Sequence, residues 1–317
     1  MKSLDNNGFF RRRISSLRGH SPKQSNCFLK IDCFLLRSSQ FAMTVILSLA
    51  IFFPISCFSQ EETPVSLTYR VNQVGYGISN TYDSYLSPLK YSGENLGFHF
   101  EQMRNTGLMG GNVLEQHFLN ANYSWTKNKT GTASYYTGLL EYNYGLLYRL
   151  QQAEKFQLYT GMQAGGLTGF VYNTRNGNNP ATGKAHLNLS LSAIANYKMR
   201  IRSQPLNLRY QISLPFVGVM YAPQFGQSYY EIGLGVTDNL VHFASFHNYI
   251  STRNILSAEV PLNKFTLLLS YHFSFYETRI NDIDTQLINN TLFLGLSTNL
   301  FVVTGKQKNN NYRYVYE

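Results

Sequence analysis

Cysteine is confined to one end of the chain. The 317 residues contain three cysteines, Cys27, Cys33 and Cys57, and none follows residue 60. Residues 60–317 therefore have no disulfide framework and no thiolate metal site. An absence of cysteine fits an envelope protein, which has to avoid mispairing in an oxidising compartment.

Charged residues are also scarce, at 14% of the chain, and they are unevenly distributed. Residues 1–59 hold eight of the 27 Lys and Arg and two of the 17 Asp and Glu, which leaves 19 cations against 15 anions, or +4, for the remainder. Such a weak excess provides no phosphate-binding stripe, so we expect no nucleic-acid partner. Aromatic residues make up 15% of the chain, which excludes intrinsic disorder.

Long apolar runs are equally rare, and the only one is MTVILSLAIFFPISCF, within residues 43–59. It is too short to cross a bilayer comfortably as a helix, and we interpret it as the hydrophobic region of a signal peptide cleaved after Ser59. Residues 1–42 form an N-terminal extension, either a long n-region or the product of a mis-called start. A signal anchor is the alternative, which Pro54 disfavours, and Cys57 as a lipidation site follows an imperfect lipobox.

The dominant pattern after residue 60 is alternation of apolar and polar residues, which is typical of strands. Residues 187–201 and 206–216 both alternate, and the tight link between them predicts an antiparallel hairpin. Over the whole chain the pattern predicts strands near residues 67–78, 95–104, 113–126, 134–150, 156–172, 185–202, 206–220, 228–237, 240–249, 253–261, 265–277 and 288–301.

Twelve is an even number of strands, as a closed antiparallel transmembrane β-barrel requires. We therefore expect residues 60–317 to form one all-β outer-membrane barrel with 12 strands. If residues 228–237 and 240–249 both belong to one long loop, the number becomes ten. With a periplasmic N-terminus, the expected external loops are longer than the periplasmic turns, as in other barrels of this type. Closure requires the last strand, 288–301, to pair with the first, 67–78.

Charged residues on the polar face of these strands favour a membrane barrel over a soluble one. A dry core would not tolerate them unless they were paired, whereas a water-filled lumen would. We expect a polar network in the lumen formed by Arg70, Glu141, Arg149, Lys198, Arg200, Arg209 and Glu259. Either this network is structural, or it lines a binding cavity or narrow channel. Aromatic residues near strand ends are expected to form interfacial girdles: Trp125, Tyr136, Tyr148, Tyr172, Tyr221 and Tyr276.

Three short segments carry a resemblance to a known group of proteins. They are FSQ at 58–60, NTYDSYLSP at 80–88 and FGQSYYE at 225–231. With them, most of residues 60–317 resembles an uncharacterised outer-membrane β-barrel family, a domain of unknown function, from Bacteroides-type Gram-negative bacteria. The resemblance implies location and fold, and it implies no reaction.

The pattern that most resembles an enzyme is His272 with Ser274. A His two residues before a Ser on a barrel strand resembles the arrangement in outer-membrane phospholipases and lipid A deacylases, where His activates the Ser oxygen. Those enzymes present the pair to lipid. Here Phe273 and Phe275 occupy the apolar face, so alternation directs His272 and Ser274 into the lumen and opposes lipid hydrolysis.

Together these patterns predict a non-enzymatic outer-membrane protein, either a structural envelope component or a barrel that binds or transports a small solute. A membrane-embedded lipid hydrolase using His272 and Ser274 is the alternative. We expect no cofactor and no metal. The expected partners are outer-membrane lipid, lipopolysaccharide and the barrel-assembly machinery.

Overall fold

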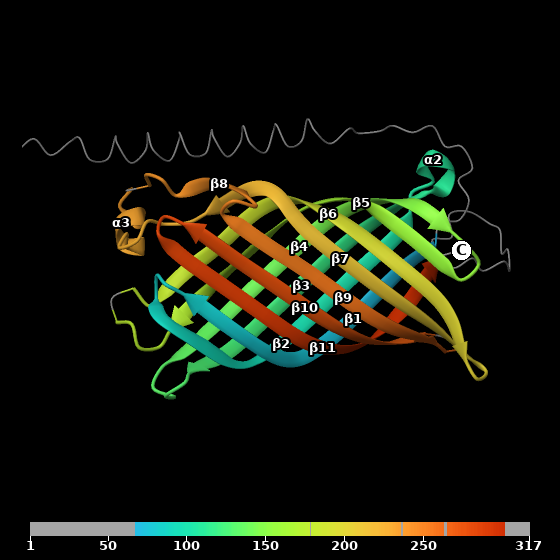
Figure 1. The fold of residues 1–317 in the computed structure, drawn as a ribbon, viewed down its shortest axis with the longest axis horizontal. Coiled ribbons are helices and arrows are strands. Elements are labelled where there is room, and N and C mark those ends of the chain that lie inside the picture. The colour runs from blue at the N-terminus through green and yellow to red at the C-terminus, as the bar shows by residue number, and fades with distance from the viewer. Residues whose placement is uncertain (1–66, 178, 236, 263–264, 302–317) are drawn as a thin grey trace, which may run out of the picture. The chain divides into compact units, whose positions relative to one another are not determined.

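The computed structural model describes residues 67–177, 179–235, 237–262 and 265–301, which form a β-barrel (Figure 1). The signal-peptide interpretation of residues 1–59 and the C-terminal segment 302–317 lie outside the described residues. None of the helices among the described residues is long and apolar enough to cross a membrane.

Strands account for most of the described chain. They are β1 (Leu67–Asp83), β2 (Ser87–Asn105), β3 (Val113–Asn128), β4 (Ser134–Gln152), β5 (Phe156–Asn173), β6 (Ala181–Ile201), β7 (Gln204–Tyr221), β8 (Val241–Ser245), β9 (Tyr249–Pro261), β10 (Thr266–Ile280) and β11 (Ile283–Phe301). Two short helices lie in connections, α2 (Leu108–Gly111) and α3 (Tyr229–Gly233).

Every strand pairs antiparallel with its neighbours, and the sheet closes on itself. β1 pairs with β11 from Leu67 opposite Phe301 to Asp83 opposite Thr285. This is the closure predicted between the first and last strands, and it satisfies backbone groups that an open edge would leave unpaired in hydrocarbon.

The described barrel has ten strand positions, so the expectation of 12 strands was wrong and its alternative of ten is confirmed. β8 and β9 run in the same direction along β7, β8 opposite residues 217–221 and β9 opposite residues 207–213, and together they fill one position. The described part of residues 228–237 forms no strand, because Ser228 and Glu231 make a capping box that starts α3.

Alternation assigns each strand an inner and an outer face. On β11, Leu292 and Leu294 are 55% exposed on the outside, whereas Phe293 between them is 2% exposed in the lumen. Phe293 fits there because Gly75 and Gly97 have no side chain. A Cβ atom on Gly97 would lie 2.4 Å from its ring. Tyr276, expected in the girdle, is instead buried in the lumen.

The connections at the two ends of the barrel are of similar length, with one exception at the outer end. The end that holds Leu67 and Phe301 is the periplasmic end under the expected orientation, and we call the opposite end the outer end. Strands reach further toward the outer end than expected, so that β1 and β2 are joined by residues 84–86 alone, and β10 and β11 by residues 281–282. The longest connection, residues 222–240, also lies at the outer end and contains α3.

Candidate functional site: the filled lumen

The periplasmic end of the lumen is filled by apolar side chains. Tyr69 and Val71 of β1 pack there with residues from six other strands, and every member is at most 5% exposed. The cluster consists of Tyr69, Val71, Met103, Leu114, Leu147, Tyr159, Ile194 and Leu268. Because these side chains pack together, they form an apolar layer across this end of the barrel.

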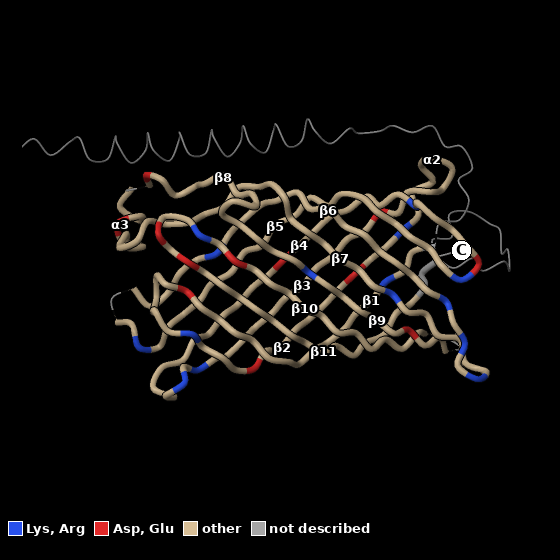
Figure 2. Tube along the Cα trace, viewed as in Figure 1, with Lys and Arg blue, Asp and Glu red and all other residues tan. Residues whose placement is uncertain are grey.

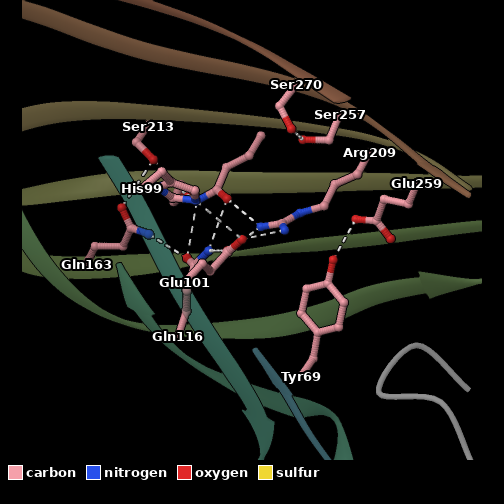
Figure 3. Close-up of polar contacts among 12 residues, drawn as sticks. Tyr69, His99, Glu101, Gln116, Gln163, Arg209, Ser213, Ser257, Glu259 and Ser270 are labelled. Carbon is pink, nitrogen blue, oxygen red and sulfur yellow. Dashed lines mark hydrogen bonds and ion pairs between the residues drawn. The ribbon is translucent and has the colours of Figure 1, made fainter. Parts of the chain in front are cut away.

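The middle of the lumen is crossed by an ion pair between Glu101 and Arg209 (Figure 3). Glu101 lies on β2 and Arg209 on β7, which are five strand positions apart in either direction and so face each other across the barrel. The Arg209 Nη1 atom donates to Glu101 Oε2 at 2.6 Å. The pair is bidentate, because the Nη2 atom also donates to Glu101 Oε1, which is the strongest geometry for such a pair.

Glutamine side chains link this ion pair to further strands. The Gln116 amide of β3 donates to Glu101 and, at 3.0 Å, to Gln211 of β7. Gln163 of β5 donates to Gln116 at 2.7 Å. These buried amides thus satisfy one another inside the lumen, as a buried polar network requires.

A second cross-lumen ion pair joins Arg253 of β9 to Glu141 of β4. Arg253 also donates to Gln163 at 3.1 Å, and its guanidinium lies 3.8 Å from the centre of the Phe118 ring. Gln163 and Gln116 therefore link the two ion pairs into one network. Glu259 is bound separately, by the Tyr69 hydroxyl at 2.9 Å and the Asn207 amide at 3.1 Å.

A third ion pair lies nearer the outer end. The Lys184 Nζ atom of β6 lies 2.7 Å from Asp83 Oδ2 of β1, again across the full barrel, and donates to Thr285 at 2.8 Å. Nearby, the rings of Tyr91 and Tyr135 stack at 3.6 Å. Two apolar clusters fill the remaining space at this end: Met220, Ala244, Tyr249, Tyr276, Ile280 and Leu287, and Leu86, Tyr91, Ala133, Tyr135 and Val171.

Between the central network and the outer clusters lies a cavity of about 60 Å³. Its lining includes Glu141, Arg253, His186, Tyr249 and Ser274. One water needs about 10–15 Å³ of such space, so the cavity has room for a few waters. It is much smaller than the roughly 300 Å³ at which pockets for organic ligands begin.

Two of the seven predicted network residues, Arg209 and Glu141, lie in the central network, and a third, Glu259, is buried in the lumen but bound separately. Three others lie near the periplasmic end: Arg149 donates to Asn112 at 2.6 Å, Lys198 is half-buried and Arg200 is exposed. Arg70 corrects the prediction, because it lies on the outer face, where it donates to Gln102 at 3.0 Å beside Phe100.

Four charged residues of the lumen were not predicted from the sequence: Glu101, Arg253, Asp83 and Lys184. Glu101 and Arg253 lie at inward positions of predicted strands, so strict alternation could have identified them. Asp83 and Lys184 fall in segments predicted as external loops, and no sequence signal showed that β1 and β6 continue through them.

His272 and Ser274 face the lumen, as alternation predicted. The His272 ring lies 4.1 Å from that of Phe293 and 4.9 Å from that of His99. Ser274 instead accepts a hydrogen bond from Asn289 at 3.3 Å. Since no hydrogen bond joins His272 to Ser274 among the described residues, the arrangement lacks the contact by which a base activates a nucleophile.

The connection 222–240 is attached to other parts of the outer end. Tyr85 donates to the Gln227 carbonyl at 2.7 Å and meets Tyr229 edge-on, with ring centres 6.4 Å apart. Tyr229 accepts a hydrogen bond from the backbone of Gly183, and Asn281 donates to the Ala222 carbonyl at 3.0 Å. Burial, together with the neighbouring Tyr229, raises the pKa of Tyr85 to about 12.

The start of α3 is held by its capping box. Glu231 accepts from the Ser228 backbone N–H at 2.8 Å, and the Ser228 hydroxyl accepts from the Glu231 N–H at 3.2 Å. The Ser228 hydroxyl also donates to the Glu231 carboxylate at 3.1 Å. The bonds that this carboxylate accepts, first from the Ser228 backbone and then from its hydroxyl, lower the pKa of Glu231.

The described residues contain no group of three or more His, Cys, Asp or Glu side chains placed to hold a metal ion. The barrel instead has the distribution that a membrane requires, with an apolar outer belt and a polar centre. Only helices and closed barrels can satisfy their backbone within hydrocarbon. The protein is accordingly an outer-membrane β-barrel.

Comparison with known proteins gives a family and several barrels of similar architecture. Residues 43–307 match a family described as "Protein of unknown function (DUF3316)". No curated protein matches the chain. Solved structures that resemble it include the outer membrane protease OmpT from Escherichia coli, with 8% identity, a TM-score of 0.40, and coverage of 77% of this chain and 99% of OmpT.

Two other solved barrels are similar at the same low level. The translocator domain of the autotransporter NalP from Neisseria meningitidis has 10% identity and a TM-score of 0.38, with coverage of 83% and 96%. Ail of Yersinia pestis, in complex with the heparin analogue sucrose octasulfate, has 10% identity and a TM-score of 0.31, with coverage of 73% and 98%. Similarity this distant says nothing about activity or partners.

Proposed function

The chain belongs to the DUF3316 family of proteins of unknown function, and we propose that it is a non-conducting outer-membrane barrel that serves as a structural component of the envelope. The observation that carries this proposal is the filled lumen. Side chains from opposite strands bond across the barrel, so a solute would have to break the ion pairs Glu101–Arg209 and Arg253–Glu141 to pass.

The layers around these ion pairs support the same function. Apolar clusters lie on both sides of the polar network, and the cavity of about 60 Å³ has room for water but not for an organic solute. Of the two roles that the sequence left open, the filled lumen therefore favours the structural role over binding or transport of a small solute.

We also propose that the protein is not an enzyme. His272 and Ser274 face a lumen closed to lipid and do not bond to each other, so neither the substrate nor the activated oxygen of a lipid hydrolase is provided. As expected from the sequence, we further propose that the protein comes from a Bacteroides-type bacterium. We also propose that the barrel-assembly machinery inserts it into the outer membrane.

Planar lipid bilayers test the non-conducting barrel directly. The purified protein, folded as shown by a heat-modifiability gel, should produce no discrete current steps, whereas a general porin inserted under the same conditions should produce them. Reproducible steps from the folded protein would show that the lumen conducts and would overturn the proposal.

A lipid assay tests the absence of enzymatic activity. Neither the parent protein nor a Ser274→Ala variant should release fatty acid from phospholipid or lipopolysaccharide. Release by the parent that disappears in Ser274→Ala, with folding unchanged, would restore the lipid hydrolase.

A further inference from the structure

The outer wall of the barrel is hollowed over four adjacent strands, β2 to β5. Small residues form the floor of this groove, with Ala121 and Gly138 among them, and larger apolar residues form its walls, with Phe98, Tyr123 and Phe170 among them. The Phe170 ring covers Gly138, where a Cβ atom would lie 2.7 Å from it. The groove faces lipid, because its large side chains, those of Phe98, Tyr123 and Phe170, are exposed on the outward side of their strands.

Three lysines lie beyond the groove on the same strands, toward the outer end. Lys127 of β3 is opposite Ser92 of β2, Lys90 lies two residues further along β2, and Lys129 follows in the turn after β3. All three side chains are exposed. We call Lys90, Lys127 and Lys129 the lysine ridge. Neighbouring like charges repel, so such a cluster is unfavourable unless an anion joins it.

No ion pair between described residues involves the lysine ridge, whereas Arg279 at the same end is paired. Arg279 lies 3.0 Å from Glu277 Oε1 and 3.9 Å from Asp284 Oδ1. The carboxylate beside the ridge is that of Glu94, which accepts a hydrogen bond from the Trp125 indole at 2.9 Å. Figure 2 shows blue and red segments at this end of the barrel, with blue ones gathered on the lower side of the view.

The depth of the lysine ridge relative to the groove matches that of lipid headgroups relative to acyl chains. Lys127 lies four residues beyond Tyr123, or about 13 Å along the strand, which a tilt of about 45° reduces to roughly 9 Å of height. Trp125 lies between them on the same face, with its ring 6.2 Å from that of Tyr123. Aromatic side chains of this kind mark the membrane interface.

We propose that the groove and the lysine ridge together bind one phosphorylated glycolipid of the outer leaflet, a lipid A, with an acyl chain in the groove and its phosphates on the lysines. This rests on the orientation expected from the sequence, with residues 222–240 outside. Three exposed cations are more than one phosphate diester needs, whereas a lipid A with two phosphates carries a charge that matches them.

Charge removal at the ridge gives the first test. The full-length protein in detergent micelles is titrated with fluorescent bisphosphorylated lipid A. At roughly fivefold per cation near an anionic lipid, the variant Lys90→Gln/Lys127→Gln/Lys129→Gln should bind about 100-fold more weakly. Arg279→Gln removes a paired cation at the same end and should leave the affinity within about twofold. Unchanged binding in the triple variant would overturn the proposal.

Filling the groove gives the second test. Ala121→Trp places a large ring on the floor of the groove and should weaken lipid A binding at least tenfold. The matched control is Ala193→Trp, which adds the same ring to the outer face of β6, and it should bind like the parent. Equal effects of the two substitutions would show that the groove holds no acyl chain.

Competition identifies the ligand. Dephosphorylated lipid A should compete poorly, and inorganic phosphate should not compete at millimolar concentration, because it lacks the acyl chain. If phosphatidylglycerol competes as well as lipid A, the site is a general phospholipid site and the proposal fails. Each variant is checked for the heat-modifiable folded form, and conductance is measured separately, so failure here is distinct from failure of the non-conducting barrel.

Discussion

Removing the cation of the central ion pair should destabilise the barrel strongly. Arg209 and Glu101 side chains are 3% and 4% exposed, so an Arg209→Gln substitution leaves the Glu101 carboxylate buried without its bidentate partner. Breaking a buried pair in this way costs about 3–5 kcal/mol, chiefly because the remaining charge is uncompensated. We expect a loss of that size in the free energy of unfolding.

The double variant Glu101→Gln/Arg209→Gln separates the loss of the pair from the lone charge. It removes both charges while keeping amides that can bond to Gln116 and Gln211, so most of the stability should return, to within about 1.5 kcal/mol of the parent. The control is Arg104→Gln on the outer wall. Arg104 pairs with Glu115, but its side chain is 52% exposed, so its removal should cost less than about 1 kcal/mol.

Urea unfolding in detergent or in vesicles, followed by the fluorescence of Trp125, measures all four proteins. Trp125 is the only tryptophan and lies on the outer wall, away from the substitutions. If Arg209→Gln cost no more than Arg104→Gln, or if the double variant were no more stable than Arg209→Gln, the central pair would not hold the lumen together as described.

Two further experiments test the packing around Phe293 and the cap of α3. Gly97→Ala forces a methyl group against the Phe293 ring and should lower the free energy of unfolding by about 1–3 kcal/mol, and Phe293→Leu in the same chain should recover part of it in the same assay. The lowered pKa of Glu231 means that its contribution to the α3 cap is complete above the ordinary glutamate pKa and is lost as the pH falls through the lowered value. As the pH is lowered through the acid range, cleavage within residues 222–240 by an acid-stable protease should therefore increase more in the parent than in Glu231→Gln. Parallel pH profiles of the two proteins would contradict the cap.

The sequence predicted the barrel, its closing strand pair and the facing of most strands, because alternation has a direct cause in strand geometry. The prediction for Arg70 was wrong because the apolar residues of β1 switch from the inner face to the outer face along the strand. Tyr69 and Val71 fill the apolar layer in the lumen, whereas Val74 and Tyr76, on the opposite face, contact lipid. The rule that apolar residues face outward holds only where lipid surrounds the strand and the lumen is polar.

The strand count and most of the ion pairs were harder to derive. The sequence predicted two strands here, 240–249 and 253–261, whereas the structure interrupts the chain at residues 246–248 instead. Only pairing with β7 shows that β8 and β9 share one position. The partner of Arg209 is Glu101, 108 residues earlier in the chain. Such contacts depend on the circumference of the closed barrel, which local patterns do not contain.

The cross-lumen ion pairs also constrain the order of assembly. Glu101 and Arg209 lie on opposite walls, so they can meet only after the sheet has curved into a ring. A partly formed sheet inserted in lipid would expose both charges to hydrocarbon, and each would cost several kcal/mol. Curvature and closure should therefore accompany insertion, with little population of half-built sheets, so that the barrel enters the membrane as a single cooperative unit.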